Sequence, residues 1–270
     1  MRIERIVPRR GINDENQGKK HALYRLISTA TADYVWLQDD DIIPPAAGDE
    51  EVLSAIGDAD MLILPLRMEP ETAKPSLLER LQTAEYAAIQ QLTLETAARG
   101  HAVMCSGANL VVRRERWLES YADLHPEIPS GDDMFLLESF KRRGLKIKTL
   151  SLNPKHPTLN SLTATVRPQP SWRTFFRQRM RWAGKAPAYT DRDIILCGMW
   201  VAATNILQFL CPPVVLLKFP FDYALIRRRN PSVSFGIAFL LALIYPCYML
   251  ICLVGGIVRT HATKKHPKTW

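Results

Sequence analysis

Three consecutive carboxylates, Asp39, Asp40 and Asp41, are the first side chains in the sequence whose spacing suggests chemistry. They follow the apolar run Tyr34–Gln38, which is rich in aromatic and β-branched residues and predicts a short strand. Carboxylates this close repel one another, and a bound divalent cation relieves that repulsion. Mg²⁺ in particular uses one or two carboxylates together with substrate phosphates. The pattern therefore predicts a metal-bound substrate at the end of a strand, with a solvated acidic turn as the alternative.

A second carboxylate pair, Asp132 and Asp133, stands at the predicted start of a helix that ends at Gly144. A carboxylate there can act as a general base if it lies within hydrogen-bond reach of an attacking hydroxyl. The alternative is structural, because Ser130 with Asp133 three residues later fits a capping box, and carboxylates in a first turn favour the helix dipole. Spacing alone does not separate the two interpretations.

Basic and aromatic residues supply two further candidate sites. Gly18-Lys19 opens a predicted helix that runs to about Thr31, and such a start can hold a phosphate through backbone N–H groups and an ammonium. A solvated basic helix start is the alternative for this segment.

The fourth candidate site is the sequence Gln178-x-x-Arg181-Trp182. In it Arg181 suits a phosphate, and the ring of Trp182 offers a face to a sugar or a base. Anchoring at a membrane interface explains the same residue types.

The elements that must position these residues follow the order strand, helix, strand over Tyr34–Gln38, Asp49–Ile56 and Met61–Leu66. This order predicts α/β winding with a parallel sheet, in which ligands collect outside the carboxyl ends of the strands. A long amphipathic helix is expected from Pro75 to about Arg99. The remaining strand candidates are Arg2–Val7, Leu110–Val112 and Leu145–Leu150.

The C-terminal part of the chain has a different composition. Ile194–Leu217 and Val233–Val258 contain no charged residue, and each exceeds the roughly 20 residues that cross a bilayer as a helix. Pro212-Pro213 is expected to kink or break the first stretch. We therefore predict a catalytic domain over residues 1–190 and a membrane region over 191–270 with two or three transmembrane segments, buried core helices being the alternative.

The net charge of +8 raises the question of nucleic-acid binding. The basic residues are scattered, and no nucleic-acid-binding motif accompanies them. We therefore expect no nucleic-acid partner.

Five short motifs occur together in a recognisable order: Gly18-Lys19-x-x-Ala22-Leu23, Asp39-x-Asp41, Gly107-Ala108-Asn109, Gly131-Asp132-Asp133 and Gln178-x-x-Arg181-Trp182. In order and rough spacing they resemble family 2 glycosyltransferases, most of all the membrane-bound branch that includes cellulose, hyaluronan and ceramide-glucose synthases. The resemblance covers the chain from about Arg2 to Trp182.

The resemblance implies an inverting transfer of a sugar from a nucleotide diphosphate donor, with a UDP-sugar as the expected donor. It implies Mg²⁺ or Mn²⁺ as cofactor, a lipid or glycan acceptor, and a catalytic domain on the cytosolic face of the inner membrane. The implied fold class is α/β, a GT-A-type (Rossmann-like) mixed sheet with helices, followed by C-terminal transmembrane helices.

The resemblance also implies a role for each site residue. Asp39 contacts the nucleotide and, with Asp41, the metal; Lys19 touches the donor. Asp133 is the base that deprotonates the acceptor hydroxyl, with Asp132 beside it. The acceptor and diphosphate end is lined by Gln178, Arg181 and Trp182.

The sequence departs from the family pattern at its start. Family members begin with a strand ending near Pro-x-x-Asn-Glu and a second strand whose Asp reads the nucleobase, and the sequence starts after both. The expected fold is therefore a truncated GT-A sheet, and we expect these residues alone to fold poorly or to bind donor weakly.

Two other functions remain open from the sequence. One is a non-catalytic membrane remnant of the family, and the other is a metal-dependent phospho- or nucleotidyl-transferase that acts on lipid phosphates. Gln178-x-x-Arg181-Trp182 counts against both, because neither class requires it.

Overall fold

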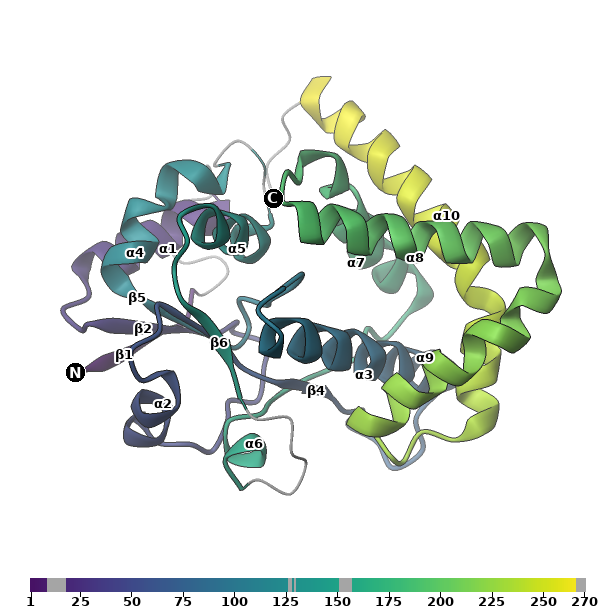
Figure 1. Cartoon of the computed structure of the whole chain (residues 1–270), viewed down its shortest axis with the longest axis horizontal. Coiled ribbons are helices and arrows are strands. Elements are labelled where there is room, and N and C mark those ends of the chain that lie inside the picture. Colours follow the sequence, from purple (N-terminus) through teal and green to yellow (C-terminus); the bar gives the residue numbers. More distant parts are fainter. Residues whose placement is uncertain (9–17, 126–127, 129, 151–156, 266–270) are drawn as a thin grey trace. The chain divides into compact units, whose positions relative to one another are not determined.

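The computed structural model describes the chain except residues 9–17, 126–127, 129, 151–156 and 266–270 (Figure 1). The described residues form two compact units. Among the described residues, unit 1 contains Met1–Leu66 and Thr93–Val166, and unit 2 contains Arg67–Leu92 and Arg167–Lys265. The predicted domains, 1–190 and 191–270, stay a prediction, and residues 266–270 of the second lie outside the described residues.

Unit 1 is built on a five-stranded sheet with the strand order β1-β2-β5-β3-β6. The pairs β1–β2 and β3–β6 are parallel, whereas β5 runs antiparallel to both β2 and β3. The mixed sheet implied by the family resemblance is confirmed, and the prediction of a wholly parallel sheet is wrong for β5. The strands are β1 (Ile3–Ile6), β2 (Tyr34–Leu37), β3 (Met61–Ile63), β5 (Leu110–Arg113) and β6 (Ile147–Thr149).

Helices cover both faces of this sheet, which explains why its central strands are continuously apolar. All four residues of β2 are buried, although alternate side chains point to opposite faces. Tyr34 and Trp36 join a core cluster with Val52 and Ile56 of α2 (Asp49–Ile56). The other face is covered by α1 (Gly18–Thr29), α4 (Arg114–Glu119) and α5 (Asp132–Arg142) (Figure 1).

The register of the sheet determines which loops meet at each edge. Leu37 pairs with Leu110, and Leu110 pairs with Ile63. The carboxyl ends of β2 and β3 therefore lie at the same edge as the start of β5. The residues after Leu37 carry the Asp39-x-Asp41 motif and those before Leu110 carry the Gly107-Ala108-Asn109 motif, so the topology brings these two motifs together.

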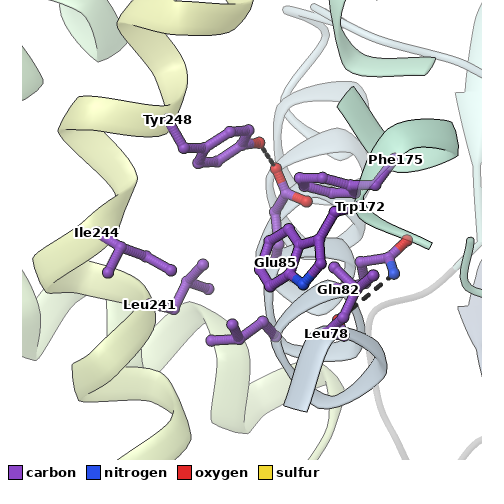
Figure 2. Close-up of a pocket in the computed structure, with 9 residues that line it drawn as sticks. Leu78, Gln82, Glu85, Trp172, Phe175, Leu241, Ile244 and Tyr248 are labelled. Atoms are coloured by element: carbon purple, nitrogen blue, oxygen red, sulfur yellow. Dashed lines mark hydrogen bonds between the residues drawn. The ribbon is translucent and has the colours of Figure 1, made fainter. Parts of the chain in front are cut away.

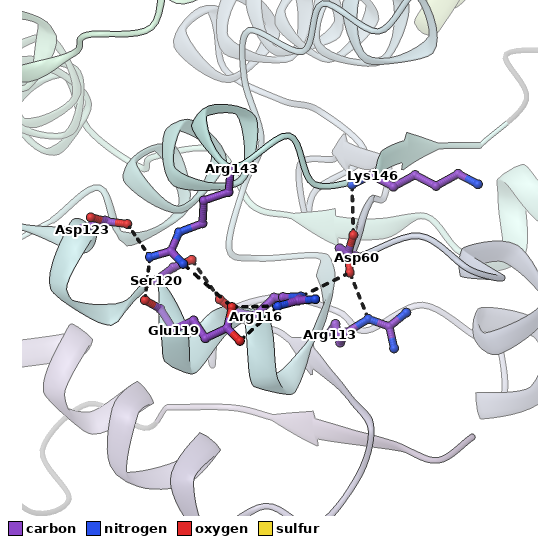
Figure 3. A network of polar contacts seen from close by, with 8 residues as sticks. All are labelled: Asp60, Arg113, Arg116, Glu119, Ser120, Asp123, Arg143 and Lys146. Atoms are coloured by element: carbon purple, nitrogen blue, oxygen red, sulfur yellow. Dashed lines mark hydrogen bonds and ion pairs between the residues drawn. The ribbon is translucent and has the colours of Figure 1, made fainter.

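The opposite edge of the sheet carries a network of ion pairs (Figure 3). Asp60, just before β3, accepts hydrogen bonds of 3.0 Å from the Arg113 side chain and the Lys146 backbone N–H. The network continues through Arg116, Glu119, Ser120, Asp123 and Arg143. It joins β3, β5, α4 and α5 at the edge away from the motifs, and its role is structural.

The run Met61–Leu66 forms two strands where the sequence predicted one. β3 ends at Ile63, and β4 (Leu66–Met68) begins after Pro65. Proline has no N–H to donate to a ladder, so pairing stops there. The chain leaves unit 1 within β4 and again after β7 (Ala164–Val166).

Unit 2 is helical. Its helices are the first part of α3 (Leu77–Ala98), α7 (Trp172–Ala183), α8 (Arg192–Leu210), α9 (Val215–Arg229) and α10 (Phe235–Lys265). The start of α3 has a capping box, in which the Ser76 N–H donates to Glu79 Oε2 over 2.7 Å and the Glu79 N–H to Ser76 Oγ over 3.3 Å. The short helices of the chain are α6 (Pro157–Ser161), η1 (Tyr121–Leu124), η2 (Ala186–Ala188) and η3 (Pro212–Val214).

Two helices of the described chain are long and apolar enough to cross a membrane. They are Arg192–Leu210, with a mean hydropathy of 1.5, and Phe235–Val258, with a mean hydropathy of 2.5. The predicted break at Pro212-Pro213 is confirmed, because α8 ends at Leu210 and α9 begins at Val215.

α7 and α10 approach each other closely at two glycines of α10. A Cβ atom on Gly256 would lie 2.6 Å from the Met180 carbonyl oxygen and 2.7 Å from the Gly184 nitrogen. On Gly255 it would lie 2.8 Å from Met180 Cε. The absence of side chains therefore lets α10 contact the backbone of α7 directly.

Candidate active site

Lys19 of α1 joins two of the predicted site carboxylates in unit 1. Its Nζ lies 2.7 Å from Asp39 Oδ1, just after β2, and 3.4 Å from Asp132 Oδ2 at the start of α5. The Lys19 side chain is 29% exposed, that of Asp39 33% and that of Asp132 10%. Three segments far apart in the sequence thus meet at one ammonium group, which remains accessible from solvent.

Electrostatics keep this ammonium protonated. Burial alone would lower the pKa of Lys19, but the charges of Asp132, Asp39 and Asp133 and the hydrogen bond to Asp39 raise the pKa above its ordinary value. The neighbouring Lys20 is buried and donates to the carbonyl oxygens of His125 and Ile128 at 2.8 Å. The alternative of a solvated basic helix start is therefore wrong for Lys20, whereas Lys19 is partly exposed and paired with carboxylates.

Asp133 lies beside the small-residue turn before β5. Its Oδ2 accepts a hydrogen bond of 3.3 Å from the Gly107 backbone N–H. A Cβ on Gly107 would lie 3.4 Å from Asp132 Oδ2 and 3.7 Å from Lys19 Nζ. Gly107 thus lines the same site as the three charged groups, and its lack of a side chain leaves space next to them.

The capping-box alternative for Ser130 and Asp133 is wrong, whereas Asp132 and Asp133 do lie in the first turn of α5, where carboxylates favour the helix dipole. α5 begins at Asp132, and its N-cap residue is Gly131, with a φ of 86° and no side-chain capping bond. The Asp133 carboxylate instead accepts from Gly107 and, over 2.8 Å, from the Met134 N–H. The left-handed backbone at Gly131 turns the chain so that both aspartates enter the site.

Asp40 and Asp41 lie in the turn after β2, and both are exposed. No group of three or more His, Cys, Asp or Glu residues that could hold a metal ion occurs among the described residues. The carboxylates after β2 still fit a hard divalent cation, because such an ion takes one or two carboxylates from the protein and completes its coordination shell with substrate phosphates. Asp39 uses only Oδ1 toward Lys19, which leaves its second oxygen for such an ion.

Asn109 is a structural residue of the site that the sequence did not reveal as such. It is 1% exposed, and its Oδ1 accepts from Trp36 Nε1 over 2.9 Å. Its Nδ2 donates to the carbonyl oxygens of Pro65 and Leu162, each at 2.9 Å. One amide thus ties β2, the chain after β3 and the chain after α6 together. These three hydrogen-bond partners lie far from Asn109 in the sequence, so no local pattern predicts that they are buried against its side chain.

Gln178, Arg181 and Trp182 lie on α7 in unit 2. Arg181 is exposed and makes no hydrogen bond or ion pair to a described residue, while Gln178 and Trp182 are partly buried. Both contact Arg179: its Nη1 donates to Gln178 Oε1 over 2.7 Å, and its Cζ lies 4.2 Å from the centre of the Trp182 ring.

Comparisons with known proteins agree with this fold and these motifs. The sequence profile of the family described as "Glycosyltransferase like family 2" matches residues 1–185. No curated protein matches the sequence.

Solved structures similar to this one include the mannosyltransferase PcManGT from Pyrobaculum calidifontis in complex with GDP-Man and Mn²⁺. It is 16% identical with a TM-score of 0.50, and the match covers 92% of this chain and 68% of that one. S. aureus TarS 1-349 is 11% identical with a TM-score of 0.35, over 95% of this chain and 73% of that one.

A family profile that matches residues 1–185 of 270 covers more than half of the chain, and the described fold is the mixed α/β sheet expected for it. The chain therefore belongs to the glycosyltransferase-like family 2 and is a glycosyltransferase.

Proposed function

We propose that this glycosyltransferase moves a sugar from a nucleotide diphosphate donor to a lipid or glycan acceptor, with inversion at the anomeric carbon. The observation that carries the proposal is the meeting of Lys19, Asp39, Asp132 and Asp133 at one edge of the sheet. A cation, two carboxylates and a separate candidate base are the groups that this transfer requires.

In the proposed reaction, the acceptor hydroxyl oxygen forms a bond with the anomeric carbon while the bond from that carbon to the phosphate oxygen breaks. The hydroxyl proton passes to the Asp133 carboxylate, and the nucleotide diphosphate leaves. Lys19 offsets the negative charge that develops on the leaving diphosphate. Asp132 helps to keep the Lys19 ammonium in place.

We further propose that Asp39 and Asp41 hold Mg²⁺ or Mn²⁺ in the presence of donor. When bound, such an ion supplies additional charge neutralisation at the diphosphate. PcManGT, which is similar in fold, is solved with GDP-Man and Mn²⁺. This supports a nucleotide sugar as donor, with GDP-sugars and the UDP-sugars expected from the family resemblance as the first to test.

On α7, we propose that Gln178, Arg181 and Trp182 line the acceptor and diphosphate end. The exposed Arg181 guanidinium keeps its donors available for a ligand, and the partly exposed Trp182 ring suits a sugar face.

We propose that α8 and α10 attach the protein to the inner membrane, with unit 1 on the cytosolic side. Large apolar side chains are widely exposed on both helices; those exposed by half or more include Leu196, Met199, Trp200, Leu210, Ile251 and Val254. Carbonate washing of cell membranes tests this, and we expect the chain to stay in the pellet. Recovery of the chain in the wash supernatant would show that these helices do not insert.

A sugar-transfer assay tests the proposed reaction. We expect full-length protein in detergent, with Mn²⁺, to transfer sugar label from a UDP- or GDP-sugar to a membrane lipid or glycan extract. Asp133→Asn should lower the rate about 10²- to 10⁴-fold, the usual contribution of a general base, while Asp58→Asn, an exposed position, should not. Undiminished transfer by Asp133→Asn, or transfer of label from the donor phosphate, would overturn the proposal.

A further inference from the structure

Arg179 and Glu85 form a buried ion pair in unit 2 that the proposed reaction does not use. Each side chain is 4% exposed. Arg179 Nη2 donates to Glu85 Oε2 over 2.6 Å and Nε donates to the same oxygen over 3.2 Å. Burial alone would lower the pKa of Arg179, but Glu85 raises it above the ordinary value, so the guanidinium stays charged.

The same guanidinium contacts two residues of the Gln178-x-x-Arg181-Trp182 motif. Its Nη1 donates to Gln178 Oε1 over 2.7 Å, and its plane lies against Trp182, with Cζ 4.2 Å from the ring centre. Arg179 Cζ also lies 4.9 Å from the centre of the Phe175 ring. One buried side chain thus fixes the amide of Gln178 and the ring of Trp182 together.

We propose that Arg179, held by Glu85, is a positioning residue that sets the orientation of Gln178 and Trp182 toward the ligand. This inference rests on the proposed role of the motif at the acceptor and diphosphate end. Arg179 itself does not touch the ligand.

A tyrosine of α10 completes the arrangement (Figure 2). The Tyr248 hydroxyl donates to Glu85 Oε1, the carboxylate oxygen that Arg179 does not use. Glu85 on α3 is therefore fixed from two sides, by α7 and by α10. Trp172, Phe175 and Leu241 line the same apolar pocket as Glu85, and the ion pair itself is buried.

A stabilising role alone does not explain this geometry. Buried ion pairs contribute little net stability, because the loss of hydration offsets their attraction, and well-packed apolar residues replace them at no cost. What a buried guanidinium offers is a planar group with donors in fixed directions and a face for aromatic stacking. Lysine has the charge but neither of these features, so Arg179→Lys separates positioning from charge.

The other arginines of α7 differ from Arg179. Arg177 and Arg181 are exposed, and neither forms a hydrogen bond or ion pair with a described residue. Arg177→Lys is therefore a matched control on the same helix, outside the proposed machinery.

The activity arm of the test uses full-length protein and steady-state sugar transfer. We expect Arg179→Lys and Glu85→Gln to lower kcat at least tenfold, and Arg177→Lys to leave it unchanged. Because Arg179 acts through Trp182 as well as through Gln178, Arg179→Lys should lower kcat by a smaller factor in a Trp182→Phe background than in wild type, since the effects of coupled residues are non-additive. An equal loss in both backgrounds would show that Arg179 acts independently of Trp182.

The spectroscopic arm does not depend on activity. The chain has six tryptophans, and ¹⁹F NMR of protein labelled with 5-fluorotryptophan identifies the Trp182 resonance by its loss in Trp182→Phe. We expect this resonance to move in Arg179→Lys and Glu85→Gln but not in Arg177→Lys. The resonance of Trp36, which lies in unit 1, should stay fixed and report that each variant is folded.

The outcomes distinguish the two proposals. If the wild-type protein transfers no sugar, the proposed function fails, and the Trp182 resonance still decides whether Arg179 positions the ring. An unmoved resonance in folded Arg179→Lys, or a moved resonance with unchanged kcat in an active enzyme, overturns the inference. Should Arg179→Lys fail to fold, Tyr248→Phe is measured in its place and judged by the same outcomes. This variant removes the hydrogen bond from Tyr248 to Glu85 and leaves the ion pair between Glu85 and Arg179 in place.

Discussion

At the residue scale, the candidate active site depends on charged side chains that meet because the fold brings distant segments together. Lys19 pairs with Asp39 and Asp132, and Gly107 leaves the space beside them open. The family motifs named all four residues, but the sequence did not show that one ammonium joins two of the carboxylates. That contact depends on how α1 packs against the sheet, which the local sequence does not encode.

Gly107→Ala tests whether the space at this turn serves a ligand. The new methyl group would stand 3.4 Å from Asp132 Oδ2, an ordinary van der Waals contact, so we expect an unchanged melting temperature. It also fills space next to the Lys19 ammonium, so the donor KM should rise about tenfold, equivalent to about 1.4 kcal/mol. Gly48→Ala, with no atom within 4 Å of its Cβ, is the control. An unchanged donor KM in Gly107→Ala would place the donor elsewhere.

Asp58 provides a pH-dependent contribution to stability. Hydrogen bonds from Lys146 and Lys148 lower its pKa from 3.8 to about 2. A depressed pKa in the folded state means that the stabilisation is present above pH 3.8 and is lost as the pH falls toward 2. Urea unfolding of wild type and Asp58→Asn between pH 5 and 2 should therefore show a smaller loss of stability in the variant. Parallel pH profiles would argue against these hydrogen bonds.

At the element scale, strands and helices were predictable where a segment carries its own periodic pattern. α2 has the predicted bounds, Asp49–Ile56, and β2 and α5 lie within a residue or two of their predicted ends. The direction of β5 and the split at Pro65 were not predictable in this way. Strand direction is determined by the partners that a strand finds across the sheet, and not by its own sequence.

Asn109 holds elements together rather than binding a ligand. Replacing it with alanine would leave the Trp36 N–H and two buried carbonyl oxygens without their partner. At about 1–3 kcal/mol for each unsatisfied group, we expect Asn109→Ala to lower the free energy of unfolding by about 3 kcal/mol or more. Denaturant unfolding measures this, with the exposed Asn160→Ala as control. A loss as small as that of the control would contradict the assigned role.

Gly256 allows α10 to contact the backbone of α7. Alanine there would place a methyl group 2.6 Å from the Met180 carbonyl oxygen, and overpacking of this kind typically costs about 1–3 kcal/mol. We expect Gly256→Ala to lower the melting temperature in detergent and to reduce transfer, since α7 carries the motif. Gly236→Ala, in open space on the same helix, gives the same gain in helix propensity without the clash. Equal melting temperatures for the two variants would refute this packing.

At the scale of the whole molecule, the sequence indicated a family 2 glycosyltransferase with a mixed sheet and apolar C-terminal helices, and the family, the sheet and the two helices are confirmed. It did not indicate that Arg67–Leu92 belongs with the helices after Arg167 in one unit. That grouping arises from contacts such as Glu85–Arg179, which join residues 94 positions apart. Contacts of this separation leave no periodic signal in either segment.

The most direct measurement for the central claim is calorimetric titration of full-length protein in detergent with UDP and with GDP, with and without Mn²⁺. We predict that Mn²⁺ strengthens binding of one nucleotide and that Asp39→Asn loses at least tenfold in affinity together with this Mn²⁺ dependence. Asp49→Asn, an exposed carboxylate of unit 1, should match the wild type. If Asp39→Asn bound the nucleotide with wild-type affinity and wild-type Mn²⁺ dependence, the carboxylates at the end of β2 would not form the donor site.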